Sequence, residues 1–133
     1  MKRYLNPPTV ETPKGPYSQG LEIAPNARWV YVAGQGGSHP DGSMAETLEA
    51  QAEQALRNIL HVLADAGMDA DDIVRMTTYV VTDKRGMDLI IPISKARAAV
   101  LGDARPTGTM VVVSGFALPQ MLIEIDAVAA RAD

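Results

Sequence analysis

Two carboxylates, Glu124 and Asp126, lie two residues apart within an otherwise apolar stretch near the end of the chain. They alternate with Ile123, Ile125 and Ala127, which is the period-two pattern of a half-buried strand. A carboxylate in such a strand is costly unless it is paired or hydrogen-bonded, because leaving water disfavours its charged form. Glu124 is therefore either half of an ion pair at an interface or a group that positions and activates water, as a general base does.

The other residues with reactive side chains give weaker signals. The chain has no cysteine, which excludes disulfides, zinc ribbons, iron–sulfur ligation and a thiol nucleophile. His61 lies between Leu60 and Val62 with no second ligand at metal-binding spacing, so we expect an ordinary helix residue. His39 belongs to the glycine-rich segment 34–42, which lacks the Gly-Lys-Ser/Thr ending of a phosphate-binding loop. The sequence therefore predicts no metal site.

The composition is that of one acidic globular domain over residues 1–133. With 12 Lys and Arg against 16 Asp and Glu, the net charge is −4. This balance argues against nucleic acid as a partner, because phosphate binding needs clustered Lys and Arg. The basic start of the chain runs into Pro7 and Pro8 instead of an apolar segment, and the uncharged stretch 107–123 is too short and interrupted to span a membrane. We expect a cytoplasmic protein with no membrane partner.

The side chains available for a core are mostly small. The chain has one Trp, four Tyr and one Phe, so Ala, Val, Ile, Leu and seven Met must fill the interior. Small side chains bury little area each, and a lone subunit of this size would be only modestly stabilised. Burial of further surface in an oligomer is one ordinary remedy.

Hydrophobic periodicity and turn residues predict alternating strands and helices. The clearest helix covers residues 46–66, where apolar residues recur every three or four positions. Ser43 and Thr47 are both candidate N-caps, and Gly67 supplies a left-handed C-terminal stop. A second helix is expected from residue 89 or 92 to residue 101. Strands are expected at residues 21–23, 29–33, 73–82, 109–113 and 121–129.

This order of elements predicts a two-layer α+β domain. Both helices can lie on one face of a mixed β-sheet. The other face is then left uncovered, and an uncovered apolar face is normally buried against another subunit. The pattern of elements therefore agrees with the composition in favouring self-association.

Several sequence motifs, taken together, carry more specific information. They are segments 15–20 (GPYSQG), 32–35 (VAGQ), 49–59 (EAQAEQALRNI), 62–67 (VLADAG), 72–74 (DIV), 78–80 (TYV), 105–107 (RPT), 117–119 (ALP) and 122–129 (LIEIDAVA). In this order, and over nearly the whole chain, they resemble the Rid family, also called the YjgF/YER057c/UK114 or L-PSP family.

The resemblance implies a fold, an assembly and a chemistry. Members of the family have a chorismate-mutase-like α+β fold and form homotrimers whose sheets line a central barrel, with small-molecule sites in clefts between subunits. The best-known members hydrolyse reactive enamines and imines, such as aminoacrylate, to ketoacids and ammonia. They need no cofactor. For this chain the resemblance therefore implies a cofactor-independent imine or enamine deaminase.

The family's site matches this chain in part. It uses a tyrosine, a glycine backbone group, a glutamate, a helix asparagine and an arginine that holds the substrate carboxylate. Tyr17 matches the tyrosine and Glu124 the glutamate, which implies catalytic roles for both. Gly34 matches the glycine, while Ala33 stands where the family has a serine. These two positions are expected to contact the substrate.

Two polar anchors of the family's site are missing. Gly108 stands at the position of the arginine, and residues 91–94 contain no asparagine. A neutral residue cannot reproduce a bidentate guanidinium, so we expect a bulkier or uncharged substrate in place of the usual α-imino acid, in a pocket that Gly108 opens. Arg105 lies three positions upstream and could bind substrate only if the chain turns there, because in an extended chain its side chain points to the opposite face.

Two classes of function follow from the sequence. The first is a hydrolase in which Glu124 activates water and the Gly34 backbone holds the substrate nitrogen or carboxylate. The alternative is a non-catalytic trimer that binds or senses a small molecule. Ribonuclease activity is disfavoured, because the chain offers no basic groove and no histidine pair for acid–base cleavage.

Overall fold

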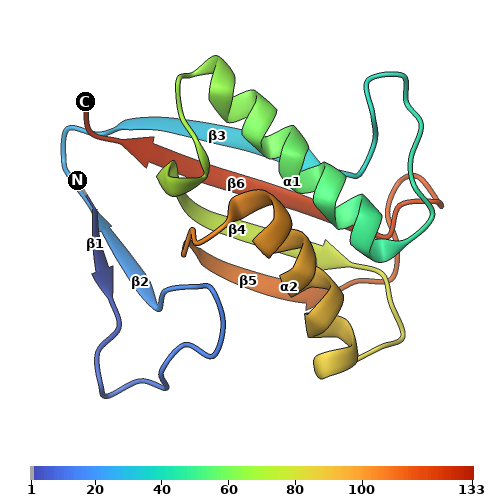
Figure 1. Cartoon of the computed structure of the whole chain (residues 1–133), viewed down its shortest axis with the longest axis horizontal. Helices are drawn as coiled ribbons and strands as arrows, with labels where there is room; N and C mark the ends of the chain where they lie inside the picture. The colour runs from blue at the N-terminus through green and yellow to red at the C-terminus, as the bar shows by residue number, and fades with distance from the viewer. Residues whose placement is uncertain (1) are drawn as a thin grey trace.

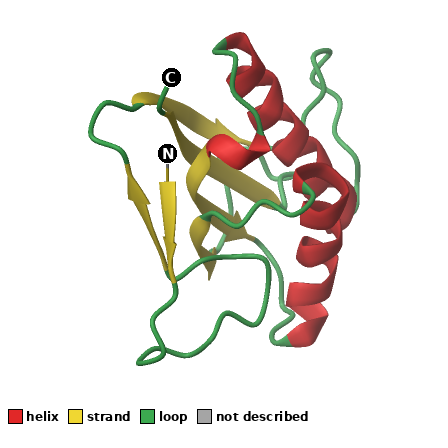
Figure 2. Cartoon of the chain, turned by 60° about the vertical axis from the view of Figure 1, so that its left-hand side comes forward, coloured by secondary structure: helices red, strands yellow, loops and turns green. Residues whose placement is uncertain are grey.

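The computed structural model describes residues 2–133 and shows a four-stranded β-sheet with both long helices packed on one face (Figures 1 and 2). The elements are β1 (Lys2–Leu5), β2 (Gly20–Ile23), β3 (Arg28–Gln35), α1 (Leu48–Asp65), the 3-10 turn η1 (Ala70–Asp72), β4 (Ile73–Val80), α2 (Met87–Leu101), β5 (Thr107–Val112) and β6 (Ile123–Arg131). The strand order is β3-β6-β4-β5, with β4 and β5 parallel and the β3–β6 and β4–β6 pairs antiparallel. The predicted two-layer α+β fold with a mixed sheet is confirmed.

Capping residues set both ends of helix α1. It begins at Leu48, two residues later than predicted, because Thr47 is the N-cap and its Oγ1 accepts a hydrogen bond from the N–H of Ala50 at 3.2 Å. The other candidate, Ser43, lies in the preceding loop, where its hydroxyl donates to a carboxylate. Gly67 has φ of 71°, the left-handed conformation expected of the glycine that ends a helix.

Helix α2 departs from the prediction at its start. It begins at Met87 instead of at residue 89 or 92, so Pro92 lies inside the helix and has no N–H to donate to the carbonyl of Asp88. The helix tolerates this loss because Leu89 and Ile93 are buried in the core.

Among residues 2–133, no helix is long and apolar enough to cross a membrane.

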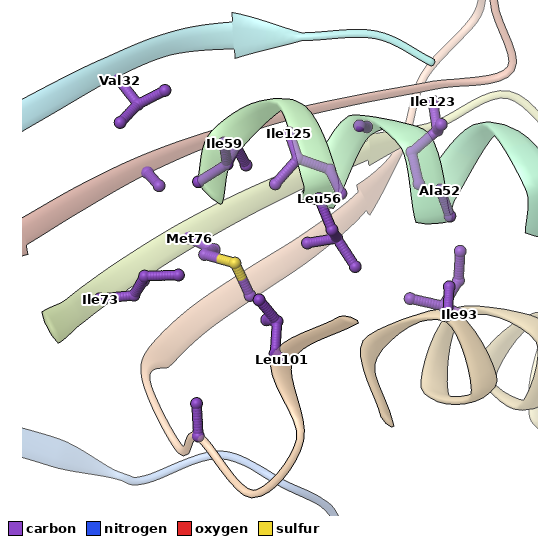
Figure 3. Close-up of a cluster of buried hydrophobic side chains, with 14 of the residues drawn as sticks. Val32, Ala52, Leu56, Ile59, Ile73, Met76, Ile93, Leu101, Ile123 and Ile125 are labelled. Carbon is purple, nitrogen blue, oxygen red and sulfur yellow. The ribbon is translucent and has the colours of Figure 1, made fainter. Parts of the chain in front are cut away.

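Strand β6 forms the centre of the core. Its side chains alternate as predicted, with Ile123 and Ile125 buried toward the helices and Glu124 and Asp126 on the other face. Figure 3 shows Ile123 and Ile125 packed with side chains of α1 and α2. The buried cluster includes Val32, Ala52, Leu56, Ile59, Ile73, Met76, Ile93 and Leu101.

Among residues 2–133, no helix packs on the other face of the sheet (Figure 2). On this face Tyr31 is 77% exposed and Trp29 is 47% exposed, both on β3. The short β1–β2 hairpin is a separate two-stranded sheet. The predicted uncovered face is therefore present, and it carries large aromatic side chains.

Candidate functional site

A pocket of ≈ 440 Å³ lies between α2, the loop before β2, and strands β4 and β5. Most of its wall is apolar and comes from Met76, Met87, Ile90, Ile93 and Met110. Tyr17 and Gly108, two of the predicted site residues, both line it. Its size is that of an ordinary small-molecule site.

Two side-chain hydrogen bonds hold the loop that presents Tyr17. The hydroxyl of buried Ser18 donates to the carbonyl of Arg105 at 2.7 Å. The Arg97 Nη2 of α2 donates to the carbonyl of Pro16 at 2.6 Å. These contacts on both sides fix the loop against α2 and the segment leading into β5, and Tyr17 is half-buried between them.

Gly108 lines the pocket from strand β5 and, having no side chain, leaves space there. It lies inside the strand and pairs with Met76 of the parallel neighbour. A Cβ built on Gly108 would lie 3.1 Å from the carbonyl oxygen of Met76 and would meet no other atom within 4 Å. Arg105 has an exposed side chain and is not one of the residues that line the pocket.

The second group of predicted residues is Gly34 and Glu124. A Cβ on Gly34 would lie 2.8 Å from the carboxyl carbon of Glu124, so only glycine lets this carboxylate lie against the β3 backbone. Neighbouring Ala33 is exposed, and its carbonyl accepts from the side chain of Gln35. Within residues 2–133, neither Glu124 nor Asp126 takes part in an ion pair.

The two groups lie on opposite faces of the sheet. Met76 and Thr78 of β4 line the pocket and point toward the helices. Side chains alternate along a strand, so Tyr79 points to the uncovered face, and Glu124, its partner in the β4–β6 register, shares that face. One chain therefore brings Tyr17 and Gly108 together but does not bring Glu124 to them.

The sequence analysis missed Arg97 and Ser94, which line the pocket from α2. Arg97 is half-buried, and this burial lowers the pKa of its guanidinium. A signal was available, because Ile90, Ile93 and Arg97 recur at positions i, i+3 and i+7 and so share one helical face. Among the residues the structure describes, no three His, Asp or Glu side chains gather as metal ligands.

The fold and the pocket define a small α+β domain with a mostly apolar pocket. The sequence profile of the family described as Endoribonuclease L-PSP matches residues 9–131. The chain belongs to this family, the Rid or YjgF/UK114 family.

Relatives at about 30% identity cover most of the chain. The crystal structure of YyfB, a Rid-family protein of unknown function from Yersinia pestis, superposes with a TM-score of 0.84 at 32% identity over 98% of both chains. A RutC family protein of Pyrococcus horikoshii is 30% identical over 97% of this chain and 98% of its own length. The 2-iminobutanoate/2-iminopropanoate deaminase of Mus musculus is 31% identical over 78% of this chain and 82% of its own. These matches support Rid-type imine deaminase chemistry in general.

Proposed function

We propose that this chain is a Rid-type hydrolase that deaminates a reactive imine or enamine in a cleft between two copies of the chain. The observation that carries the proposal is the separation of the site residues. Tyr17 and Gly108 border the pocket, while Gly34 and Glu124 lie on the opposite face of the same sheet. A second copy can supply the missing half, and the proposed assembly is a homotrimer whose sheets line a central barrel.

The proposed chemistry needs one base and a set of positioning groups. Water adds to the carbon of the C=N bond while the Glu124 carboxylate takes its proton. Glu124 passes this proton to the nitrogen, which gives an aminoalcohol. The hydroxyl proton of the aminoalcohol then moves to the nitrogen through the same carboxylate, the C–N bond breaks, ammonia leaves, and the carbon becomes a carbonyl. The Gly34 backbone, which lies against the Glu124 carboxylate, holds the nitrogen end of the substrate, and the Tyr17 hydroxyl orients the substrate from the pocket side.

The proposed substrate is larger than the smallest imino acids. Gly108 leaves an opening in the pocket, and the wall around it is formed by apolar side chains such as Ile90, Ile93 and Met110. A small imino acid would leave much of this wall in contact with water, whereas a bulkier apolar body would cover it.

The activity is tested with imines generated in the assay. An L-amino-acid oxidase with catalase produces imines from leucine, methionine, phenylalanine and 2-aminobutyrate, and the release of ammonia above the spontaneous rate is measured. We expect the chain to accelerate hydrolysis of the leucine- and methionine-derived imines more than that of 2-iminobutyrate. No acceleration with any imine would contradict the hydrolase and favour a non-catalytic binding trimer.

The assembly is tested by light scattering. We expect about three times the subunit mass of 14.2 kDa. Tyr31→Lys, on the uncovered face, should weaken the trimer, because it places a charge on a surface that the second copy covers. Val62→Lys is the matched control on the outer side of α1, where Val62 is 41% exposed, and should leave the mass unchanged. A monomer at micromolar concentration would contradict the intersubunit site.

A further inference from the structure

The pocket contains a guanidinium whose hydrogen-bonding capacity its own chain does not fill. Arg97 Nη2 donates to the carbonyl of Pro16, but Nε is buried and has no acceptor among residues 2–133. No carboxylate in that part of the chain forms an ion pair with Arg97. A buried donor without an acceptor and a buried charge without a counter-ion both destabilise the protein. An anionic ligand in the pocket would supply the missing counter-ion.

We propose that Arg97 binds the carboxylate of the substrate, and that the substrate is a 2-imino acid with a bulky apolar side chain. The inference rests on the proposed function and names its substrate class. Arg97 lies on α2 one turn after Ile93, and both residues line the pocket. The pocket thus places a cation beside an apolar wall, which is the arrangement that an apolar carboxylate requires.

The charges around the pocket favour a carboxylate over a phosphate. Lys14 is the other cation that lines the pocket, but its ammonium is exposed and lies 2.5 Å from a carboxylate oxygen of Glu11. Because Lys14 is already paired, Arg97 is the cation of the pocket that can pair with a ligand, and it can neutralise one negative charge. A planar monoanion matches one guanidinium in charge and shape, whereas a phosphate dianion would need further donors.

The apolar part of the pocket sets the shape of the rest of the ligand. Met87 and Ile90 face it from α2, and Met110 faces it from β5. Gly108 contributes no side chain that would fill the space between these walls. A branched four-carbon side chain would bury apolar area on both sides, while a methyl group would not reach them.

Binding of stable oxo acids tests the inference without requiring turnover. The probes for calorimetry are 4-methyl-2-oxopentanoate, pyruvate, which has the same charge but a smaller body, and 4-methylpentanamide, which has a similar apolar body but no charge. We expect 4-methyl-2-oxopentanoate to bind at least about tenfold more tightly than either. Equal affinity for all three, or tighter binding of inorganic phosphate, would overturn the inference.

Substitutions identify the cation. Arg97→Met should weaken 4-methyl-2-oxopentanoate binding at least about tenfold and leave 4-methylpentanamide binding unchanged, while Arg97→Lys should lose less. Lys95→Met removes an exposed cation of the same helix and serves as the matched control, with no change expected. Unchanged binding in Arg97→Met would overturn the inference, as would the same loss in Lys14→Met or Arg105→Met.

A measurement on the unaltered protein covers the case in which Arg97→Met does not fold. In a nitrogen NMR spectrum, the Nε–H signal of Arg97 should shift when 4-methyl-2-oxopentanoate saturates the pocket, and it should not shift with 4-methylpentanamide. A signal that stays in place at saturation would overturn the inference. Oxo-acid binding at Arg97 without imine hydrolysis would contradict only the proposed function. Hydrolysis with an Arg97→Met protein that keeps its KM would contradict only the role of Arg97.

Discussion

The two faces of the four-stranded sheet differ in the charged side chains that lack an ion-pair partner. On the helix-covered face, the pocket contains Arg97, a half-buried cation with no carboxylate partner among residues 2–133. On the uncovered face, Glu124 and Asp126 are carboxylates with no cationic partner in that part of the chain. Each face therefore presents charged side chains for which residues 2–133 provide no ion-pair partner.

The largest expected effect comes from Glu124 on the uncovered face. Glu124→Gln keeps the shape of the side chain but removes the base, so turnover of the imine should fall by about 10²–10⁴-fold. Ammonia release measures the change, and light scattering checks that the assembly is intact. Asp126→Asn is the matched control on the same face of β6, with turnover within about twofold of the unaltered protein. A Glu124→Gln protein that dissociates, with unchanged turnover per intact trimer, would show a structural pair instead of a base.

On the helix-covered face, replacement of Gln51 should lower the free energy of unfolding by a large amount. Its side chain is 1% exposed, and its Nε2 donates to the carbonyls of Ala45 and Gln120 at 2.8 and 3.0 Å. Its Oε1 accepts from the N–H of Leu122 at 2.8 Å. Gln51→Leu removes all three hydrogen bonds from a buried position, and urea unfolding should show a loss of about 3 kcal/mol in the free energy of unfolding. Gln54 is a half-buried residue of the same helix, and Gln54→Leu should lower the free energy of unfolding by less than half as much.

Asp72 lies away from both regions and should affect stability in a pH-dependent way. Burial alone would raise the pKa of this carboxyl, but hydrogen bonds from Arg131 and from the backbone of Asp69 outweigh it and lower the pKa below its ordinary 3.8. A carboxyl with a lowered pKa in the folded protein stabilises it at neutral pH, and this contribution is lost as the pH falls through that pKa.

The variant Asp72→Asn should therefore lose about 2 kcal/mol of stability at pH 7, measured by urea unfolding. The difference from the unaltered protein should shrink as the pH is lowered below 3.8. Asp71→Asn is the control, because the Asp71 side chain is exposed. An equal difference at pH 7 and pH 3 would contradict the role of the charge on Asp72.

The smallest expected effect comes from giving the pocket a second guanidinium. Gly108→Arg should raise hydrolysis of 2-iminobutyrate by about tenfold, because a bidentate contact to its carboxylate would not depend on a bulky side chain. Gly108→Ala separates the charge from the added Cβ, which lies 3.1 Å from the Met76 carbonyl, and should bring no gain. High activity of the unaltered protein on 2-iminobutyrate would show that an existing cation already holds small carboxylates.

Patterns that depend on near neighbours in the chain were readable from the sequence. The alternation of Ile123 and Ile125 with Glu124 and Asp126 follows from strand geometry alone, and it correctly separated the two faces of β6. The apolar stripe of α1 and its stop at Gly67 depend on the helical period and on a glycine conformation, which are also local. The motifs around Tyr17 and Glu124 led to the family in the same way.

The tertiary structure decided what depends on segments that are distant in sequence. Strand β1 was not predicted, because Lys2–Leu5 becomes a strand only by pairing with Gly20–Ile23. The start of α2 was placed too late, because the packing of Leu89 and Ile93 outweighs the preference of Pro92 for a first turn. Local preferences are weak compared with burial, so long-range packing decides such positions.

The pocket is the clearest case of a feature that only the folded chain reveals. The sequence allowed Arg105 as a replacement cation only if the chain turned there, and in the fold its side chain is exposed while its carbonyl accepts a hydrogen bond from Ser18. Arg97 enters the pocket because the Pro16 loop, α2 and β5 close around it. Which charge is buried depends on the elements that exclude water from it, and those elements come from three separate parts of the chain.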